Sequence, residues 1–478
     1  MKRFALLALA LACSGSHAKA PPPSLGPATL QLEVDARDPH AVAVTAHFLN
    51  AASSKLAFAD ETTKGLASFE IQRNGKWVKL EARSSQLEAP ECITDCTFRY
   101  VLDLEHVERS FEGVVAVGEH AFVAPSPSWM IHPDPIPKGA YDVTVLGASE
   151  PTSTFEDVPF ATGLQRKSEK DATHFAFATY DYWEGSFAAF GKLRHRMIEA
   201  AGAKIEIVLV SETKLALTDD EVATWVKEDA ECVAQIYGHF PVDRASIFIV
   251  PIDGAGEVVF GKVLSLGGSS VIALTGTRFP KENRHTDWVL VHEMTHLGFP
   301  TIGNVRWLTE GLATYYEPIL RTRKGWRTPE SLWDALAHSM KRGIPRDGAE
   351  LALDRREGID DVYWGGAIFM LLADVGIRRA TDNKKSFDDV LRYIVSQGGD
   401  ATVVWTLPEV LAAAKKATGT NVVADLVQRL AVKGERIDMD GLWRDLGVVR
   451  SPRRGLDDTA KDAAIRRSID GSSLGSAH

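Results

Sequence analysis

The chain lacks the features that mark several large classes of protein. Among its 478 residues there is no block of Lys and Arg with interleaved aromatic side chains, and the formal net charge is −10. We therefore expect no nucleic-acid partner. No apolar run reaches the roughly 18 residues that a membrane-spanning helix needs, so we expect no transmembrane segment.

Cysteine is scarce, with four in the chain. Cys92 and Cys96 flank a short polar turn, and in an oxidising compartment we expect them to form a small-loop disulfide. The alternative is a metal-binding pair, but no second Cys or His pair lies nearby in the sequence. Cys232 falls in a helical stretch and is expected to be a buried free thiol.

The N-terminus has two basic residues, a short apolar run at 4–12 and a small-x-small site at 16–18. This pattern predicts a signal peptide over residues 1–18, and with it export to the periplasm or the extracellular space. Cys13 leaves open a lipid anchor as an alternative, although the two residues before it depart from the usual lipidation pattern.

The remaining chain divides by its hydrophobic patterning into a multidomain α+β protein. Short alternating runs separated by turn residues predict a β-sandwich-like domain over 28–165. Apolar strands around a helix at 219–237 predict an α+β lobe over 172–345, and helical patterning predicts a helical lobe over 346–450. The charged, small-residue stretch 451–478 predicts a disordered tail.

The most informative stretch is His292-Glu293-Met294-Thr295-His296, which has the form HExxH. On a helix, positions i and i+4 lie about 40° apart around the axis, so both imidazoles project from one face. With Glu310 on the next predicted helix, two imidazoles and one carboxylate suit one catalytic Zn²⁺ per chain, leaving a position for water. Glu293 stands beside the ligand pair, where a carboxylate can act as general base.

The alternative explanation of HExxH is a solvated helix whose His and Glu have no joint role. The local sequence argues against it, because the apolar run 288–291 predicts a buried helix over about 286–299. Thr286 is its expected N-cap, Asp287 suits the positive helix end, and Pro300 is expected to stop the helix.

The motif and its continuation, Trp307-Leu308-Thr309-Glu310-Gly311-Leu312-Ala313, resemble the gluzincin metallopeptidases, most closely the glycyl aminopeptidase family. The leukotriene-hydrolase-like aminopeptidases are more distant relatives. A third match begins at Tyr363-Trp364-Gly365-Gly366. The resemblance implies a thermolysin-like catalytic domain with a sheet lobe, followed by a helical lobe.

Carried over by position, the resemblance implies that His292, His296 and Glu310 are the metal ligands and that Glu293 is the base. It also implies that Tyr363 donates to the developing oxyanion, a role for which Tyr315 is the rival. Three features depart from the family: a shorter loop between His296 and Glu310, glycine at 365 where a lysine is usual, and no PDZ-like segment.

Two further carboxylates are candidates with open alternatives. Glu257, in Gly254-Ala255-Gly256-Glu257, has the outline of an anchor for a substrate's free amine, but a plain strand-end glutamate fits as well. Glu317 is expected on the same helix face as Glu310, where it either accepts the second N–H of a ligand histidine or is simply solvated.

The sequence therefore predicts a secreted zinc metallopeptidase acting on a peptide or protein substrate, with exo- or endo-cleavage left open. The substrate is expected to lie as an extra strand along the sheet edge at 258–271. One rival is a zinc amidohydrolase acting on another amide. Another is a catalytically inactive binding protein, against which the intact Glu293 argues.

Overall fold

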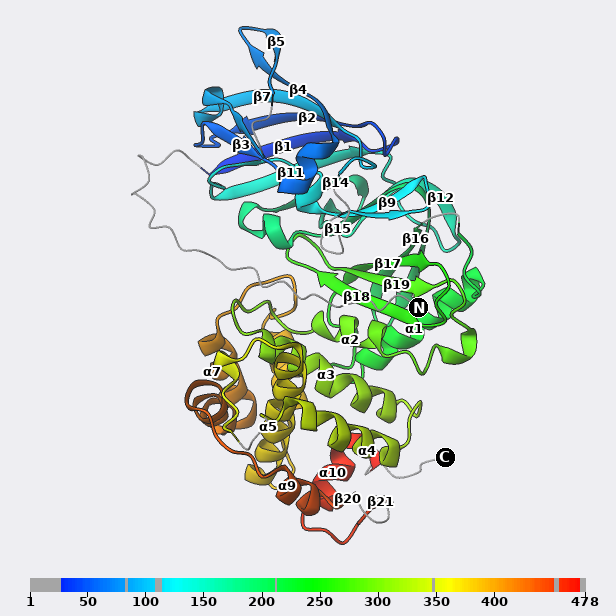
Figure 1. Cartoon of the computed structure of the whole chain (residues 1–478), viewed down its shortest axis with the longest axis vertical. Coiled ribbons are helices and arrows are strands. Elements are labelled where there is room, and N and C mark those ends of the chain that lie inside the picture. Colours follow the sequence, from blue (N-terminus) through cyan, green and yellow to red (C-terminus); the bar gives the residue numbers. More distant parts are fainter. Residues whose placement is uncertain are drawn as a thin grey trace.

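The computed structural model describes residues 27–81, 85–107, 114–210, 213–345, 349–450 and 455–472. The predicted signal peptide and Cys13 lie outside these residues. The fold is multidomain and mixes sheet with helix. In Figure 1 an N-terminal sheet lies at the top, a second sheet in the middle and a helical lobe below, with α2 between the second sheet and the helices.

The N-terminal sheet has the strand order β13-β14-β11-β1-β2-β7-β4-β5, and a smaller sheet, β10-β3-β6, lies beside it. Alternate residues of its strands are buried, as in β1 and β2, because one face of the sheet packs on the core and the other faces solvent. The strands are β1 (Ala28–Asp35), β2 (Val42–Leu49), β3 (Lys55–Ala57), β4 (Leu66–Arg73), β5 (Lys76–Lys79), β6 (Gln86–Glu88), β7 (Asp95–Leu102), β10 (His132–Pro133), β11 (Gly139–Leu146), β13 (Arg166–Ser168) and β14 (Asp171–Ala178).

The second sheet has the order β18-β19-β17-β16-β15-β9-β8, with β12 also paired with β15. Strands β16, β17 and β19 are parallel, and β18 is an antiparallel edge strand. The strands are β8 (Val115–Val117), β9 (Ala121–Pro125), β12 (Glu156–Thr162), β15 (Phe187–Ala200), β16 (Ala203–Val210), β17 (Arg244–Ile252), β18 (Val258–Leu264) and β19 (Ser270–Gly276).

The two sheets exchange segments, which corrects the predicted boundary between 28–165 and 172–345. Strands β8, β9 and β12 precede residue 165 but belong to the second sheet, whereas β14 follows it and belongs to the first. Strand pairing depends on long-range contacts that local patterning does not reveal, so the sequence placed the boundary at a change of pattern and missed these crossings.

The helices continue the core of the second sheet. Ile205, Ile207 and Leu209 of β16 face one cluster with the helices, while Val208 and Val210 face another cluster on the opposite side. The helices are α1 (Asp219–Val233), α2 (Val289–His296), α3 (Arg306–Arg323), α4 (Pro329–Ser339), α5 (Gly366–Ala380), α6 (Phe387–Ser396), α7 (Leu407–Thr418), α8 (Val422–Leu426), α9 (Met439–Leu446) and α10 (Ala463–Asp470). One hydrophobic core therefore joins the sheet to the helical lobe, with no break at residue 345.

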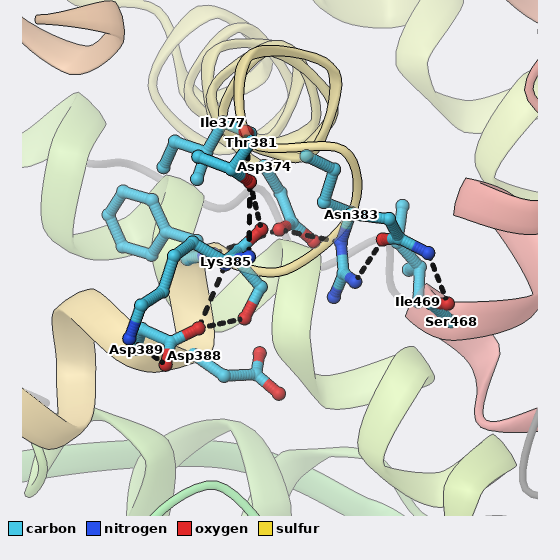
Figure 2. Close-up of polar contacts among 12 residues, drawn as sticks. Asp374, Ile377, Thr381, Asn383, Lys385, Asp388, Asp389, Ser468 and Ile469 are labelled. Atoms are coloured by element: carbon cyan, nitrogen blue, oxygen red, sulfur yellow. Dashed lines mark hydrogen bonds and ion pairs between the residues drawn. The ribbon is translucent and has the colours of Figure 1, made fainter. Parts of the chain in front are cut away.

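The prediction of a disordered tail is wrong for the part of 451–478 that the structure describes. Helix α10 packs in the helical lobe, and Ser468 accepts a hydrogen bond from the Asn383 side chain at 2.8 Å (Figure 2). The guanidinium of Arg323 donates to the carbonyl of Ile469 at 2.8 Å. The average composition of the tail concealed a helix that buries Ile465 and Ile469 on one face.

The cysteine predictions are confirmed. Cys92 and Cys96 form a disulfide, and Cys232 is a buried free thiol. Among the described residues, no helix has the length and apolar character needed to cross a membrane.

Candidate metal centre

Helix α2 carries the HExxH motif and is shorter than predicted at both ends. The carboxylate of Asp287 accepts hydrogen bonds from the backbone amides of Val289 and Leu290, each at 3.4 Å. The predicted N-cap was therefore wrong: Asp287 holds the helix start, and the hydroxyl of Thr286 donates to a carbonyl in the preceding turn. At the other end the helix stops at His296, before Pro300 is reached.

Three side chains from two helices converge where the sequence predicted the ligands. The Nε2 atom of His292 lies 3.4 Å from Oε2 of Glu310, and Nε2 of His296 lies 3.5 Å from the same oxygen. For ligand bonds of about 2.0–2.1 Å, the donor atoms of a tetrahedral zinc lie about 3.3 Å apart. The donor set and its spacing therefore fit Zn²⁺ held by His292, His296 and Glu310.

The electrostatics of the triad favour a cation. Burial lowers the pKa of His292. At His296 burial opposes protonation, but the nearby Glu310 outweighs it and raises the pKa. Burial alone would raise the pKa of Glu310, yet the imidazoles of His296 and His292 hold it well below its usual range. Glu310 thus stays ionised and gives the centre a fixed negative charge.

Glu293 lies beside the triad without belonging to it. Its side chain is buried, and it has no hydrogen bond or ion pair in the described part of the chain. Burial raises the pKa of Glu293 to about 7, with Glu310 adding to the shift and His296 and Lys262 opposing it. A carboxylate with this proton affinity is suited to accept a proton near neutral pH.

The edge strand β18 packs directly on this carboxylate. A Cβ atom at Gly261 would lie 2.5 Å from Cγ and 2.8 Å from Oε1 of Glu293. Real Cβ contacts are not this short, so only glycine lets the strand approach the side chain so closely. The contact fixes β18 against the candidate base.

Tyr363 completes the predicted constellation. It lies in η9 (Asp361–Gly365), a π-helical turn that leads into α5, and such turns are frequent at functional sites. Its ring is nearly parallel to that of His292, with centroids 6.0 Å apart. Burial raises the pKa of Tyr363, and the nearby carboxylates of Glu310 and Glu293 add to the shift. The phenol is therefore a proton donor at neutral pH.

Backbone contact between α3 and α5 positions Tyr363 next to Glu310. A Cβ at Gly311 would lie 2.3 Å from the carbonyl carbon of Gly366, and a Cβ at Gly366 would lie 2.0 Å from the Trp307 oxygen. Glu310 is next to Gly311, and Tyr363 lies one turn before Gly366. The close packing of the two helices therefore brings the side chains of Glu310 and Tyr363 together.

The rival donor, Tyr315, lies elsewhere. Its hydroxyl donates to Asp374 at 3.0 Å, and Asp374 also pairs with Arg378 at 3.0 Å. These groups belong to the buried polar network shown in part in Figure 2. The structure therefore brings Tyr363, and not Tyr315, to the triad.

Glu317 has a different partner from the predicted one. It forms an ion pair with Arg321, and within the described residues it makes no hydrogen bond to a ligand histidine. Arg321 in turn donates to the carbonyls of His285 at 3.2 Å and Thr286 at 3.0 Å, just before α2. Glu317 is therefore neither a histidine partner nor solvated: it orients an arginine that ties α3 to the start of α2.

Glu257 is not assembled with the other predicted residues. Its side chain is exposed just before β18. At about 3.3 Å per residue, four residues of strand separate it by roughly 13 Å from Gly261, where the strand meets Glu293. The structure thus supports the strand-end alternative more than the amine anchor.

Sequence reasoning missed two charged side chains, Lys262 near Glu293 and Glu184 near Lys262. Lys262 of β18 acts on both Glu293 and Glu184, lowering the pKa of each. Glu184 ends η4 (Thr179–Glu184), where burial nevertheless raises its pKa. No spacing in the sequence connects residues 184 and 262 with the HExxH helix, so only the folded chain reveals the group.

The fold is similar to that of a solved aminopeptidase N family protein, although no family model and no curated protein matches the chain. An aminopeptidase N family protein from Idiomarina loihiensis aligns at 14% identity with a TM-score of 0.64, over 88% of this chain and 78% of that chain. An M1 zinc metallopeptidase from Deinococcus radiodurans aligns at 15% identity with a TM-score of 0.47, over 86% and 93%. The first of these likenesses shows a shared fold.

Proposed function

We propose that this protein is a zinc-dependent peptide hydrolase of the gluzincin type, related to the glycyl aminopeptidases by its motifs. The observation that carries the proposal is the convergence of His292, His296 and Glu310 at the ligand spacing of zinc. When bound, zinc would polarise the scissile carbonyl and make a water molecule more acidic.

The protein's own residues have separate roles in this proposal. Glu293 accepts the proton of the attacking water and delivers it to the leaving amine, a task for which its place beside the three ligands suits it. Tyr363 donates a hydrogen bond to the oxygen on which negative charge develops. In this proposal an extended peptide pairs with the edge strand β18, which has no strand on its outer side in the described sheet, and the scissile bond lies near Glu293.

We also propose that the protein is exported. The Cys92–Cys96 disulfide supports this, because disulfides persist in oxidising compartments and are rare in the cytosol.

The experiment that tests the function is cleavage of a mixed peptide library by zinc-loaded protein, with cut positions mapped by mass spectrometry. Glu293→Gln is the matched control, since it keeps all three ligands. Cleavage by the wild type alone supports the peptidase. Hydrolysis of other amides without peptide cleavage would instead favour the amidohydrolase, and binding without turnover would favour a binding protein.

A further inference from the structure

Lys262 is partly buried, and its ammonium group has no hydrogen bond or ion pair among the residues that the structure describes. It lies near the carboxylates of Glu184 and Glu293, whose pKa values it lowers, yet it forms no hydrogen bond or ion pair with either one among the described residues. An ammonium group has three N–H donors, and that of Lys262 is not fully buried. Lys262 therefore has donors to spare for a ligand.

The position of Lys262 relative to the candidate base Glu293 is set by the neighbouring residue, Gly261. The backbone at Gly261 packs so closely against the Glu293 side chain that a Cβ atom at this position would clash with it. Lys262 follows directly, on an edge strand whose outer side has no partner in the described sheet. A peptide added along this strand would have a residue opposite Lys262, and Cβ atoms of directly opposed residues lie about 4.5–5.5 Å apart.

We propose that Lys262 is a specificity-determining residue that selects peptides with an aspartate or glutamate close to the scissile bond. This inference rests on the proposed peptidase function and names its substrate class. Because each strand residue advances the chain by about 3.3 Å, the residue opposite Lys262 lies within about two positions of the cut. A carboxylate there pairs with the ammonium, whereas a lysine is repelled.

The test uses the full-length zinc-loaded protein and peptides with one fixed cleavage site. The two residues before the cut and the two residues after it are varied one at a time. Each varied residue is Glu, Gln or Lys. At one position we expect kcat/KM to favour Glu over Gln by about 10-fold, the effect of a hydrogen bond to a charged group. Lys262→Gln should abolish this preference, Lys262→Arg should retain it and Lys262→Glu should shift it towards Lys.

Arg306 provides the matched control. It is exposed at the start of α3, and its charge lowers the pKa of Tyr363, so it is a second cation at the same site. Arg306→Gln should leave the preference for Glu intact. Zinc content and melting temperature, unchanged in Lys262→Gln, would show that its fold is preserved.

Three results would overturn the inference while leaving the peptidase intact: equal cleavage of the Glu, Gln and Lys peptides, a preference that survives Lys262→Gln, or a preference lost in Arg306→Gln. Failure to cleave any peptide would instead overturn the peptidase proposal, and this inference with it.

Discussion

Replacing Glu293 with glutamine should separate activity from stability. Glutamine has the same shape, so it fits against Gly261 where a bulkier residue would not. It cannot accept the proton, and loss of a general base costs about 10²–10⁴-fold in rate. We expect a loss within this range for the zinc-loaded protein.

The same substitution should stabilise the metal-free protein above neutral pH. The pKa of Glu293 rises from 4.5 to about 7 on folding, which corresponds to about 3 kcal/mol of unfolding free energy. Since the folded carboxyl group has the raised pKa, the wild type loses this stability as pH rises from about 4.5 to 7. Glu293→Gln, which does not ionise, should not lose it.

Two assays examine this prediction. Peptide turnover by the zinc-loaded variant measures the catalytic loss, and urea unfolding of metal-free protein at pH 5 and pH 8 measures the stability difference. Near-normal turnover in a variant with full zinc would refute the assignment of the base. An equal effect of pH on the unfolding of both proteins would refute the account of its burial.

Three further predictions follow from the site and the disulfide. Tyr363→Phe should bind substrate about normally but lower kcat by roughly 10²-fold or more, because the lost donor acts in the transition state; an unchanged kcat would limit Tyr363 to packing. Glu257→Ala should have little effect, and N-acetylated peptides should be cut as well as free ones; strict dependence on the free amine would restore the anchor role. Cys92 and Cys96 should be oxidised in protein made through the export pathway. Two free thiols, detected by mass spectrometry, would contradict the claim that the exported protein contains this disulfide.

The candidate metal centre could be predicted from the sequence because its geometry is largely local. The i, i+4 spacing of His292 and His296 places both rings on one helix face. Glu310 reaches these rings if the next helix packs against the HExxH helix. Apolar runs likewise predicted β16, β17 and β19, since strands buried on both faces are nearly continuously hydrophobic. The run that starts at Val258 predicted β18, an edge strand that is only partly buried.

The features that the sequence did not predict depend on contacts between segments that are distant in the sequence. Strands β9 and β12 joined the second sheet through pairings with β15 that no local pattern specifies. The partner of Glu317 is one helical turn away, but the sequence could not tell Arg321 from a histidine as its partner. Glu184 comes near β18 through the loop that follows this strand, where the amide of Gly267 donates to the carbonyl of Gly185 at 2.8 Å, and such a contact requires the tertiary fold.

The measurement that tests the account most directly is the zinc content of purified protein. The wild type should contain about one zinc per chain, and His296→Ala should lose it, because two ligands hold zinc far more weakly than three. Glu293→Gln should keep the metal, since this residue lies beside the triad without joining it. Equal zinc in the wild type and His296→Ala would contradict the assignment of the site.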